Sequence, residues 1–178
     1  ASKLPINIKF IIEGEEEIGS DHLEPFIKNH KELLKTDLVL ISDTSMFAKG
    51  VPSVCYSLRG LSYMQLDLVG PSKDLHSGSY GGSVHNPIQA LTEIVAQLHD
   101  KNGRITIPGL YNDVRKLTKE ERSAFKKLPW SDKKFAKDLD VKVLYGEKGY
   151  TTLERLWARP TLECNGIWGG FTGEGAKT

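Results

Sequence analysis

The chain has 178 residues, of which 39% are hydrophobic and 26% charged, values typical of one large globular domain or two small ones. Lys and Arg number 24 against 23 Asp and Glu, so the net charge of +1 gives no electrostatic reason to expect a nucleic-acid or membrane partner. No apolar run approaches the roughly 20 residues of a spanning helix, and no charged-then-apolar leader opens the sequence. Cys55 and Cys164 are isolated and lack a CxxC motif, so we expect buried thiols and a cytoplasmic protein.

The first part of the chain predicts a β-α-β unit. Residues 5–12 are β-rich and thickly apolar, and residues 38–42 form a second strand-like segment. Between them, residues 22–34 carry apolar side chains at roughly helical spacing, with Asp21 as the expected N-cap. Such a unit implies a parallel pair of strands, but alone it cannot form a sheet, so its other strands must come from elsewhere.

Carboxylates follow both predicted strands. The segment 13–20, EGEEEIGS, comes directly after the first, and Asp43 closes the second. Because ligands bind at the carboxyl ends of neighbouring parallel strands, these oxygens could hold a divalent metal, and a glutamate beside it could take a proton from water. The alternative for Glu15, Glu16 and Glu17 is a solvated acidic turn that favours the N-terminus of the following helix.

The remaining elements are predicted from alternation, caps and turn residues. Residues 52–68 alternate as in a long antiparallel strand or pair. Asn86-Pro87 begins a helix that ends by Asn102-Gly103, with Asn as N-cap and Pro at the first helical position. Thr118 and Glu121 form a capping box before a polar helix. Further along lie a surface excursion over 128–150, a short helix over 151–157 and a strand over 161–167.

Two polar residues outside the acidic cluster are candidates for a site. His76 lies in a glycine-rich stretch suited to close approach of a ligand, although a loop histidine held by backbone hydrogen bonds fits equally. Arg159 is either a surface cation or a bidentate clamp for a carboxylate. Neither a GxSxG elbow nor a phosphate-binding glycine motif is present, which argues against a serine hydrolase and a nucleotide site.

Taken together, these segments resemble a family of co-catalytic metallopeptidases that includes carnosinases, other cytosolic dipeptidases, carboxypeptidase G-type enzymes and aminoacylases. The dipeptidase branch is the most similar. The resemblance rests on five ordered motifs along nearly the whole chain: EGEEEIGS at 13–20, ISD at 41–43, DLHSGSYGG at 74–82, NP at 86–87 and RPTLECNGIWGGFTGEGAKT at 159–178.

The resemblance implies a role for each matching position. Glu16 corresponds to the general base that activates water, Glu17 to a metal ligand and Asp43 to a ligand of a second metal ion. His76 corresponds to the histidine that reaches from the lid domain, often into a partner subunit's site, to polarise the scissile carbonyl. Arg159 corresponds to the arginine that binds the substrate's carboxylate.

The same resemblance implies metal-dependent hydrolysis of dipeptides with two divalent ions, zinc or manganese. The family's remaining ligands, an earlier histidine and aspartate, a bridging aspartate and a histidine near the C-terminus, cannot be placed in this sequence. We therefore expect an internal fragment of a larger enzyme that does not turn over substrate by itself.

The expected fold class is mixed α/β and α+β. Residues 1–50 would form a β-α-β piece of the metal-binding catalytic domain. Residues 51–178 would form most of an antiparallel-sheet lid and dimerisation domain, incomplete at its C-terminal end, through which a homodimer forms. Two alternatives stay open: an N-acyl-amino-acid deacylase of the same family, and a non-catalytic dimerisation module.

Overall fold

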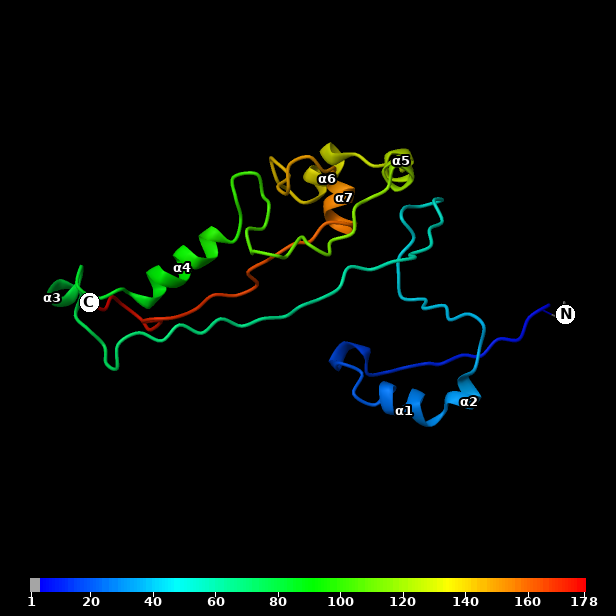
Figure 1. Ribbon diagram of the computed structural model, residues 1–178, viewed down its shortest axis with the longest axis horizontal. Coiled ribbons are helices and arrows are strands. Elements are labelled where there is room, and N and C mark those ends of the chain that lie inside the picture. The colour runs from blue at the N-terminus through cyan, green and yellow to red at the C-terminus, as the bar shows by residue number, and fades with distance from the viewer. Residues whose placement is uncertain (1–3) are drawn as a thin grey trace. The chain divides into compact units, whose positions relative to one another are not determined.

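The computed structural model describes residues 4–178. Backbone contacts divide the chain into two units, residues 1–55 and residues 56–178 (Figure 1). No helix among the described residues is long and apolar enough to cross a membrane. The two units are described separately below.

The first unit contains three short helices: the 3-10 helix η1 (Glu16–Ile18), α1 (Leu23–Asn29) and α2 (Lys31–Leu34). Gly19 ends η1 with φ of +105°, a left-handed conformation that glycine adopts without strain. His30 separates α1 from α2, so the predicted helix over 22–34 is interrupted there. The expected cap Asp21 is wrong, because His22 is the N-cap residue of α1 and provides no side-chain cap.

One long-range contact ties the start of this unit to its helical end. The Lys9 ammonium group donates hydrogen bonds to the carbonyl oxygens of Leu33, at 2.7 Å, and Lys35, at 2.8 Å. These carbonyls lie at the C-terminus of α2, where backbone oxygens lack intrahelical partners and a cation is stabilising. Lys9 therefore connects the apolar N-terminal segment to the C-terminal end of α2 through its side chain.

The second unit contains five helices within its described residues: α3 (Ser77–Tyr80), α4 (Pro87–Gln97), α5 (Lys119–Lys127), α6 (Asp132–Asp138) and α7 (Thr152–Trp157). The predicted start of α4 is confirmed, since the Asn86 side chain accepts a hydrogen bond from the Ile88 amide at 2.8 Å and Pro87 occupies the first turn. The helix ends at Gln97, earlier than predicted.

Capping boxes fix the starts of α5 and α7. The predicted box at Thr118 and Glu121 is confirmed, and the same arrangement occurs at Thr151 and Glu154. Hydrogen bonds from the Arg115 guanidinium and from the Thr118 amide lower the pKa of Glu121 to about 2. The second box is more deeply placed, because Glu154 retains only 2% of its accessible surface.

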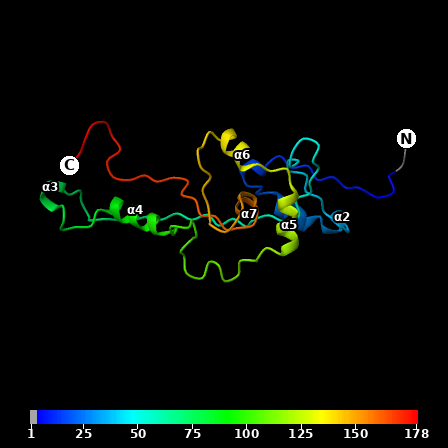
Figure 2. The same ribbon diagram turned by 90° about the horizontal axis from the view of Figure 1, so that it is seen from above.

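The core of the second unit is small and centres on α7. Ile105 and Leu153 are the buried hydrophobic residues among those described, each 3% exposed. Phe125 of α5 meets Trp157 of α7 edge to face, with ring centroids 5.3 Å apart. Both views of the ribbon show α6 close to α7, whereas α3 and α4 lie at the other end of this unit (Figures 1 and 2).

The predicted α/β and α+β fold class is wrong for this structure. Residues 4–178 contain no β-strand, and pairing is limited to isolated bridges between Ala48 and Val51 and between His99 and Ile105. The segments predicted as strands, 5–12, 38–42, 52–68 and 161–167, have no regular secondary structure. A strand needs hydrogen bonds to a neighbouring strand, and none of these segments has such a ladder partner here.

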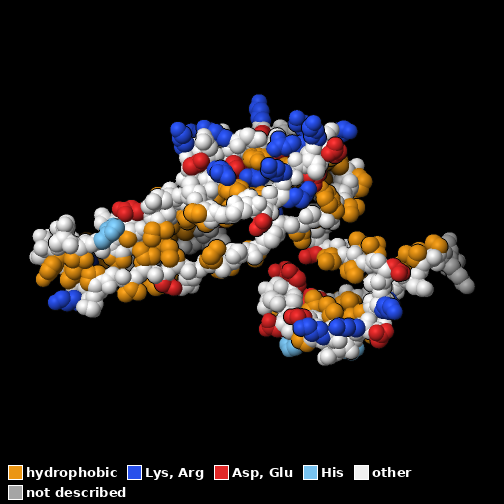
Figure 3. Space-filling view, viewed as in Figure 1, with side chains coloured by type: hydrophobic (Ala, Val, Ile, Leu, Met, Phe, Trp, Pro, Cys, Tyr) orange, Lys and Arg blue, Asp and Glu red, His pale blue; other side chains and the backbone are white. Residues whose placement is uncertain are grey.

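The unpaired segments leave apolar side chains in solvent. Ile12 is 93% exposed, Leu61 90% and Ile167 54%. Hydrophobic side chains are accordingly visible over much of the surface in Figure 3. Both cysteines are also exposed, contrary to the expected buried thiols.

The matched capping boxes allow a test of where stability resides. We expect Thr151→Ala to lower the free energy of unfolding by about 1–2 kcal/mol and Thr118→Ala by about 0.5–1 kcal/mol, because only the box of Thr151 and Glu154 reaches the buried core. Urea unfolding of the 178-residue chain, followed by far-UV circular dichroism, measures both values. A larger loss for Thr118→Ala would contradict this account of the core.

Candidate functional site

The predicted general base and metal ligand lie in an exposed turn. Glu16 and Glu17 form the first two residues of η1, and both are exposed. Their neighbour Glu15 is engaged instead, since its carboxylate oxygens lie 2.8 and 3.0 Å from Nδ1 of His22. This hydrogen bond holds the pKa of Glu15 below its usual value. The pair of Glu15 and His22, seven residues apart, was missed in the sequence.

Asp43 follows an irregular, exposed segment in the same unit. Within residues 4–178, no three His, Cys, Asp or Glu side chains are grouped so as to hold a metal ion. Glu17 and Asp43 are hard oxygen donors of the kind that divalent ions use, but two exposed carboxylates do not form a closed coordination shell. The side chains that the structure describes therefore do not fit a metal centre by themselves.

His76 occupies the N-cap position of α3 in the second unit. Its Nδ1 accepts a hydrogen bond from the Gly78 amide at 3.0 Å, and its carbonyl oxygen accepts from the amides of Ser79 and Tyr80. A neutral imidazole that accepts at Nδ1 carries its proton on Nε2, so the exposed ring presents an N–H donor. The backbone-bound loop histidine and the ligand-facing histidine are thus compatible descriptions of this residue.

Two of the sequence motifs meet at this histidine. Lys177, in the C-terminal motif, lies 2.5 Å from a carboxylate oxygen of Asp74, and the Ser77 amide donates to the carbonyl oxygen of Thr178 at 2.6 Å. The ammonium group of Lys177 lowers the pKa of Asp74. The ends of a segment about a hundred residues long are therefore brought together beside His76.

Arg159 is a buried residue with a carboxylate partner inside its own unit. Its Nε and Nη2 donate to the two oxygens of Glu147 at 2.7 and 3.0 Å, and both side chains are about nine-tenths buried. The guanidinium carbon lies 4.3 Å from the ring centre of Tyr150 and 5.1 Å from that of Tyr111. The hydrogen bonds to Glu147 raise the pKa of Arg159, so it is permanently charged. The surface-cation alternative is excluded.

The region 128–150, predicted as a surface excursion, is largely exposed, but the loop within it that supplies Glu147 makes contacts inside its own unit. Arg155 donates from Nε to the Glu147 carbonyl at 2.9 Å, and the Lys148 amide donates to the Asn102 carbonyl at 2.8 Å. Gly146 has φ of +142°, and a Cβ there would lie 2.6 Å from Cδ of Arg155. Glycines on both sides of an acidic residue, in GEKG, were the available signal.

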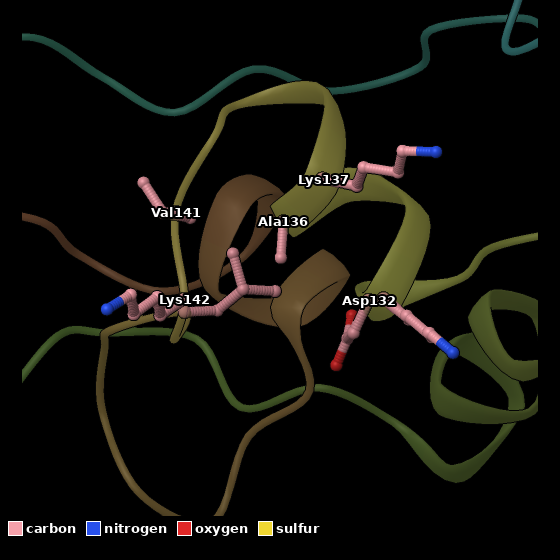
Figure 4. A pocket seen from close by; sticks show the side chains of 7 residues that line it. Asp132, Ala136, Lys137, Val141 and Lys142 are labelled. Carbon is pink, nitrogen blue, oxygen red and sulfur yellow. The ribbon is translucent and has the colours of Figure 1, made fainter.

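Two surface hollows of the second unit are lined by residues other than the predicted site residues. One, of about 520 Å³, lies beside α6, where Asp132, Ala136 and Lys137 project from the helix and Val141 and Lys142 from the segment after it (Figure 4). None of the predicted site residues lines it. A second hollow, of about 370 Å³, includes Tyr111, one of the two rings that flank Arg159.

Comparison with known families identifies the larger unit. The family described as the peptidase dimerisation domain of M20 enzymes matches residues 56–178, more than half of the chain. The chain belongs to the M20 peptidase family. The resemblance to co-catalytic metallopeptidases inferred from the motifs is thereby confirmed.

Similar M20 proteins include dipeptidases. The chain is 40% identical to the Cys-Gly metallodipeptidase of Schizosaccharomyces pombe over 98% of its own length and 37% of that protein. It is 35% identical to the human Beta-Ala-His dipeptidase over 98% of its own length and 35% of that protein. The chain therefore spans little more than a third of the curated relatives that it matches.

Solved M20 structures give the same picture. The M20 family metallo-carboxypeptidase Sso-CP2 of Sulfolobus solfataricus superposes with a TM-score of 0.70 at 37% identity, covering 93% of this chain and 38% of that one. Human carnosine dipeptidase 1 superposes with a TM-score of 0.64 at 30% identity, covering 99% of this chain and 37% of that one. Both solved relatives are peptidases by name, the first a metallo-carboxypeptidase and the second a dipeptidase.

The side chains of residues 4–178 include no grouped set of metal donors, which predicts weak metal binding by this chain. We expect calorimetric titration of the 178-residue chain with zinc, and separately with manganese, to show weak or no binding at neutral pH. Exposed carboxylates leave the ions largely hydrated and gain little from folding. Glu17→Gln is the matched variant and should change the titration little. Tight binding of two ions would contradict the prediction and show that donors are assembled from residues not grouped here.

Proposed function

We propose that this chain forms part of a metal-dependent enzyme that hydrolyses the peptide bond of dipeptides with a free C-terminal carboxylate. The observation that carries this proposal is 40% identity to a Cys-Gly metallodipeptidase extending over 98% of the chain, with a Beta-Ala-His dipeptidase matched over the same share. Both names specify dipeptides. The finer assignments below rest on the motif positions and on the chemistry of the described side chains.

The first unit supplies carboxylates in this proposal. Glu16 acts as the general base toward the attacking water, and its exposed position in η1 leaves the carboxylate accessible to solvent. Glu17 and Asp43 are the proposed ligands for two divalent ions, zinc or manganese, which carboxylates combined with histidines suit. Glu17 and Asp43 do not form a coordination shell by themselves, so the proposed metal site needs further donors besides these two carboxylates.

The second unit supplies groups that bind and polarise the substrate. Since Nδ1 of His76 accepts from Gly78, its Nε2–H is the donor that would stabilise negative charge developing on the scissile carbonyl oxygen. Arg159 would bind the substrate's carboxylate, a task for which a guanidinium group offers two parallel donors. An N-acyl-amino-acid deacylase would use the same five residues, and a panel of Cys-Gly, β-Ala-His and N-acetyl amino acids distinguishes the two activities.

Substitution at the two adjacent glutamates tests the assigned roles. In the whole protein we expect Glu16→Gln to lower kcat by about 10²–10⁴-fold with metal content near normal, because only proton transfer is removed. Glu17→Gln should lower metal occupancy, measured by elemental analysis of dialysed protein. Equal loss of metal in both variants would show that the assignment of base and ligand is wrong.

The family assignment also favours a dimerisation role for residues 56–178, since the matching family is described by that property. The unit exposes large apolar side chains, including Leu61 and Trp168, that a second copy could cover. We expect sedimentation equilibrium of the 178-residue chain to give a mass that rises with concentration toward twice 19.8 kDa. A monomer mass at every concentration would contradict a homodimer formed by this unit.

A further inference from the structure

Residues 115–148 of the second unit are strongly basic. They contain 11 Lys and Arg residues against six Asp and Glu residues, an excess of five positive charges in a chain whose net charge is +1. Helices α5 and α6 lie within this stretch. Figure 3 shows Lys and Arg side chains gathered over the part of the second unit where Figure 1 places these helices. The near-neutral charge of the whole chain therefore conceals a local basic face, formed by the exposed side chains of residues 115–148.

The lysines of the basic face have no acidic partner within the described residues. Arginines form the ion pairs here, with Arg115 contacting Glu121 at 2.7 Å and Arg122 contacting Glu154 at 3.5 Å. All nine lysines between 116 and 148 are exposed, and within residues 4–178 none forms a side-chain hydrogen bond or an ion pair. Like charges held near one another repel, so an anion that binds this face relieves the repulsion.

The hollow beside α6 gives the basic face an apolar centre. Its volume is about 520 Å³, and it is lined by three apolar side chains, three lysines and one aspartate: Ala136, Val141, Leu144, Lys133, Lys137, Lys142 and Asp132. In Figure 4 the side chain of Ala136 points toward the middle of the hollow, while Lys137 and Lys142 extend to opposite sides. The hollow therefore suits an apolar group that carries negative charges on both sides of it.

Acidic side chains among the lysines decide which kind of anion fits. Asp132 and Asp138 are the first and last residues of α6, Asp140 follows the helix, and all three are exposed. A nucleic acid carries a phosphate at every nucleotide and would be repelled by these carboxylates. Both arginines of the stretch are also bound to glutamates, although a free guanidinium is the side chain best suited to bidentate phosphate contacts. A peptide in which acidic residues alternate with neutral ones fits better.

An aromatic pair beside the hollow provides an internal reporter. The indole Nε1–H of Trp130 donates to a carboxylate oxygen of Asp132 at 2.6 Å, and the Trp130 ring lies 4.7 Å from that of Phe135 in α6. Because Asp132 lines the hollow, a ligand there changes the surroundings of this indole N–H. The signal of Trp130 can therefore locate binding without a substitution in the basic face.

We propose that the basic face binds an acidic peptide segment of a partner protein, with one aliphatic side chain of the peptide in the hollow beside α6 and its carboxylates at Lys133, Lys137 and Lys142. In an extended peptide, side chains two residues apart lie on the same face, roughly 6.5 Å from each other. Acidic residues two positions before and after the aliphatic one then reach lysines on both sides of the hollow. This interaction does not depend on the peptidase activity of the proposed function.

The first experiment measures the binding of synthetic peptides to the 178-residue chain by isothermal titration calorimetry. The probe is acetyl-ESESLSESE-amide, whose glutamates and leucine share one face when extended. Its matched controls are acetyl-QSQSLSQSQ-amide, which lacks the charges, and acetyl-ESESSSESE-amide, which lacks the apolar group. We expect the probe to bind roughly tenfold more tightly than either control, and its affinity to fall about tenfold between 50 and 300 mM salt.

The second experiment locates the bound peptide by nuclear magnetic resonance. We expect the indole N–H signal of Trp130, assigned with Trp130→Phe, to shift on addition of the probe to the ¹⁵N-labelled chain. The same signal should stay in place with the uncharged control peptide. An unmoved Trp130 signal at saturating probe would show that the peptide binds elsewhere, and the proposal would be wrong.

Charge reversal tests the lysines themselves. We expect the triple variant Lys133→Glu, Lys137→Glu and Lys142→Glu to weaken binding of the probe about tenfold or more, because attraction is replaced by repulsion. The matched control makes the same change of charge at three exposed lysines outside the basic face, Lys49→Glu, Lys73→Glu and Lys101→Glu. It should weaken binding about threefold or less. Far-UV circular dichroism checks the folding of both variants.

Four results would overturn the proposal. Absence of binding by the probe shows that the face does not take an acidic peptide. Equal affinity for acetyl-ESESSSESE-amide shows that the hollow takes no part. An equal loss in the control triple variant shows that only net charge matters. Tighter binding of an oligouridylate of eight nucleotides shows that the face is a nucleic-acid surface. If the first triple variant does not fold, the peptide comparison and the Trp130 signal still decide, since both use the unaltered chain.

Discussion

The second unit depends on a buried ion pair for its organisation. Arg159 and Glu147 contact each other through two hydrogen bonds while being about nine-tenths buried, and two tyrosine rings cover the guanidinium. Removing two charges from water costs several kcal/mol per ion, so such a pair persists only when its geometry is good and its polar atoms are satisfied. Both conditions hold here. Because Ile105 and Leu153 are the buried hydrophobic residues among those described, polar and aromatic contacts carry much of the packing around α7.

What was predicted correctly in the fold is what depends on residues close in sequence. The caps at Asn86 and Thr118 satisfy amides two or three residues away, so the sequence pattern contains the whole interaction. The strands were predicted from alternation alone, but a strand is completed by a partner that the sequence pattern cannot specify. Asp21 failed as a cap for a related reason: His22, at that position, is bound to Glu15, a residue on the other side of η1.

The sequence motifs identified each candidate residue singly, but they did not predict which side chains contact it in the folded chain. The motifs selected Arg159 and the acidic turn, and residues 56–178 do belong to the family that the motifs indicate. The ion pair joins Glu147 in a loop to Arg159, twelve positions later and beyond α7, and nothing in the sequence pattern links the two residues. The five candidates also divide between units, with Glu16, Glu17 and Asp43 in residues 1–55 and His76 and Arg159 in residues 56–178. The proposed function thus assigns proton transfer and substrate binding to different units of the chain.

The shape of the guanidinium resolves a conflict between structure and proposed function at Arg159. An arginine whose charge is neutralised by a buried carboxylate could be considered unavailable for a substrate. A lysine would be, because its ammonium group is a point charge without separate edges. Arginine instead has two edges, and Glu147 binds the one formed by Nε and Nη2. The internal pair keeps the guanidinium ordered, so that in the proposed function its remaining donors are already oriented before a substrate carboxylate arrives.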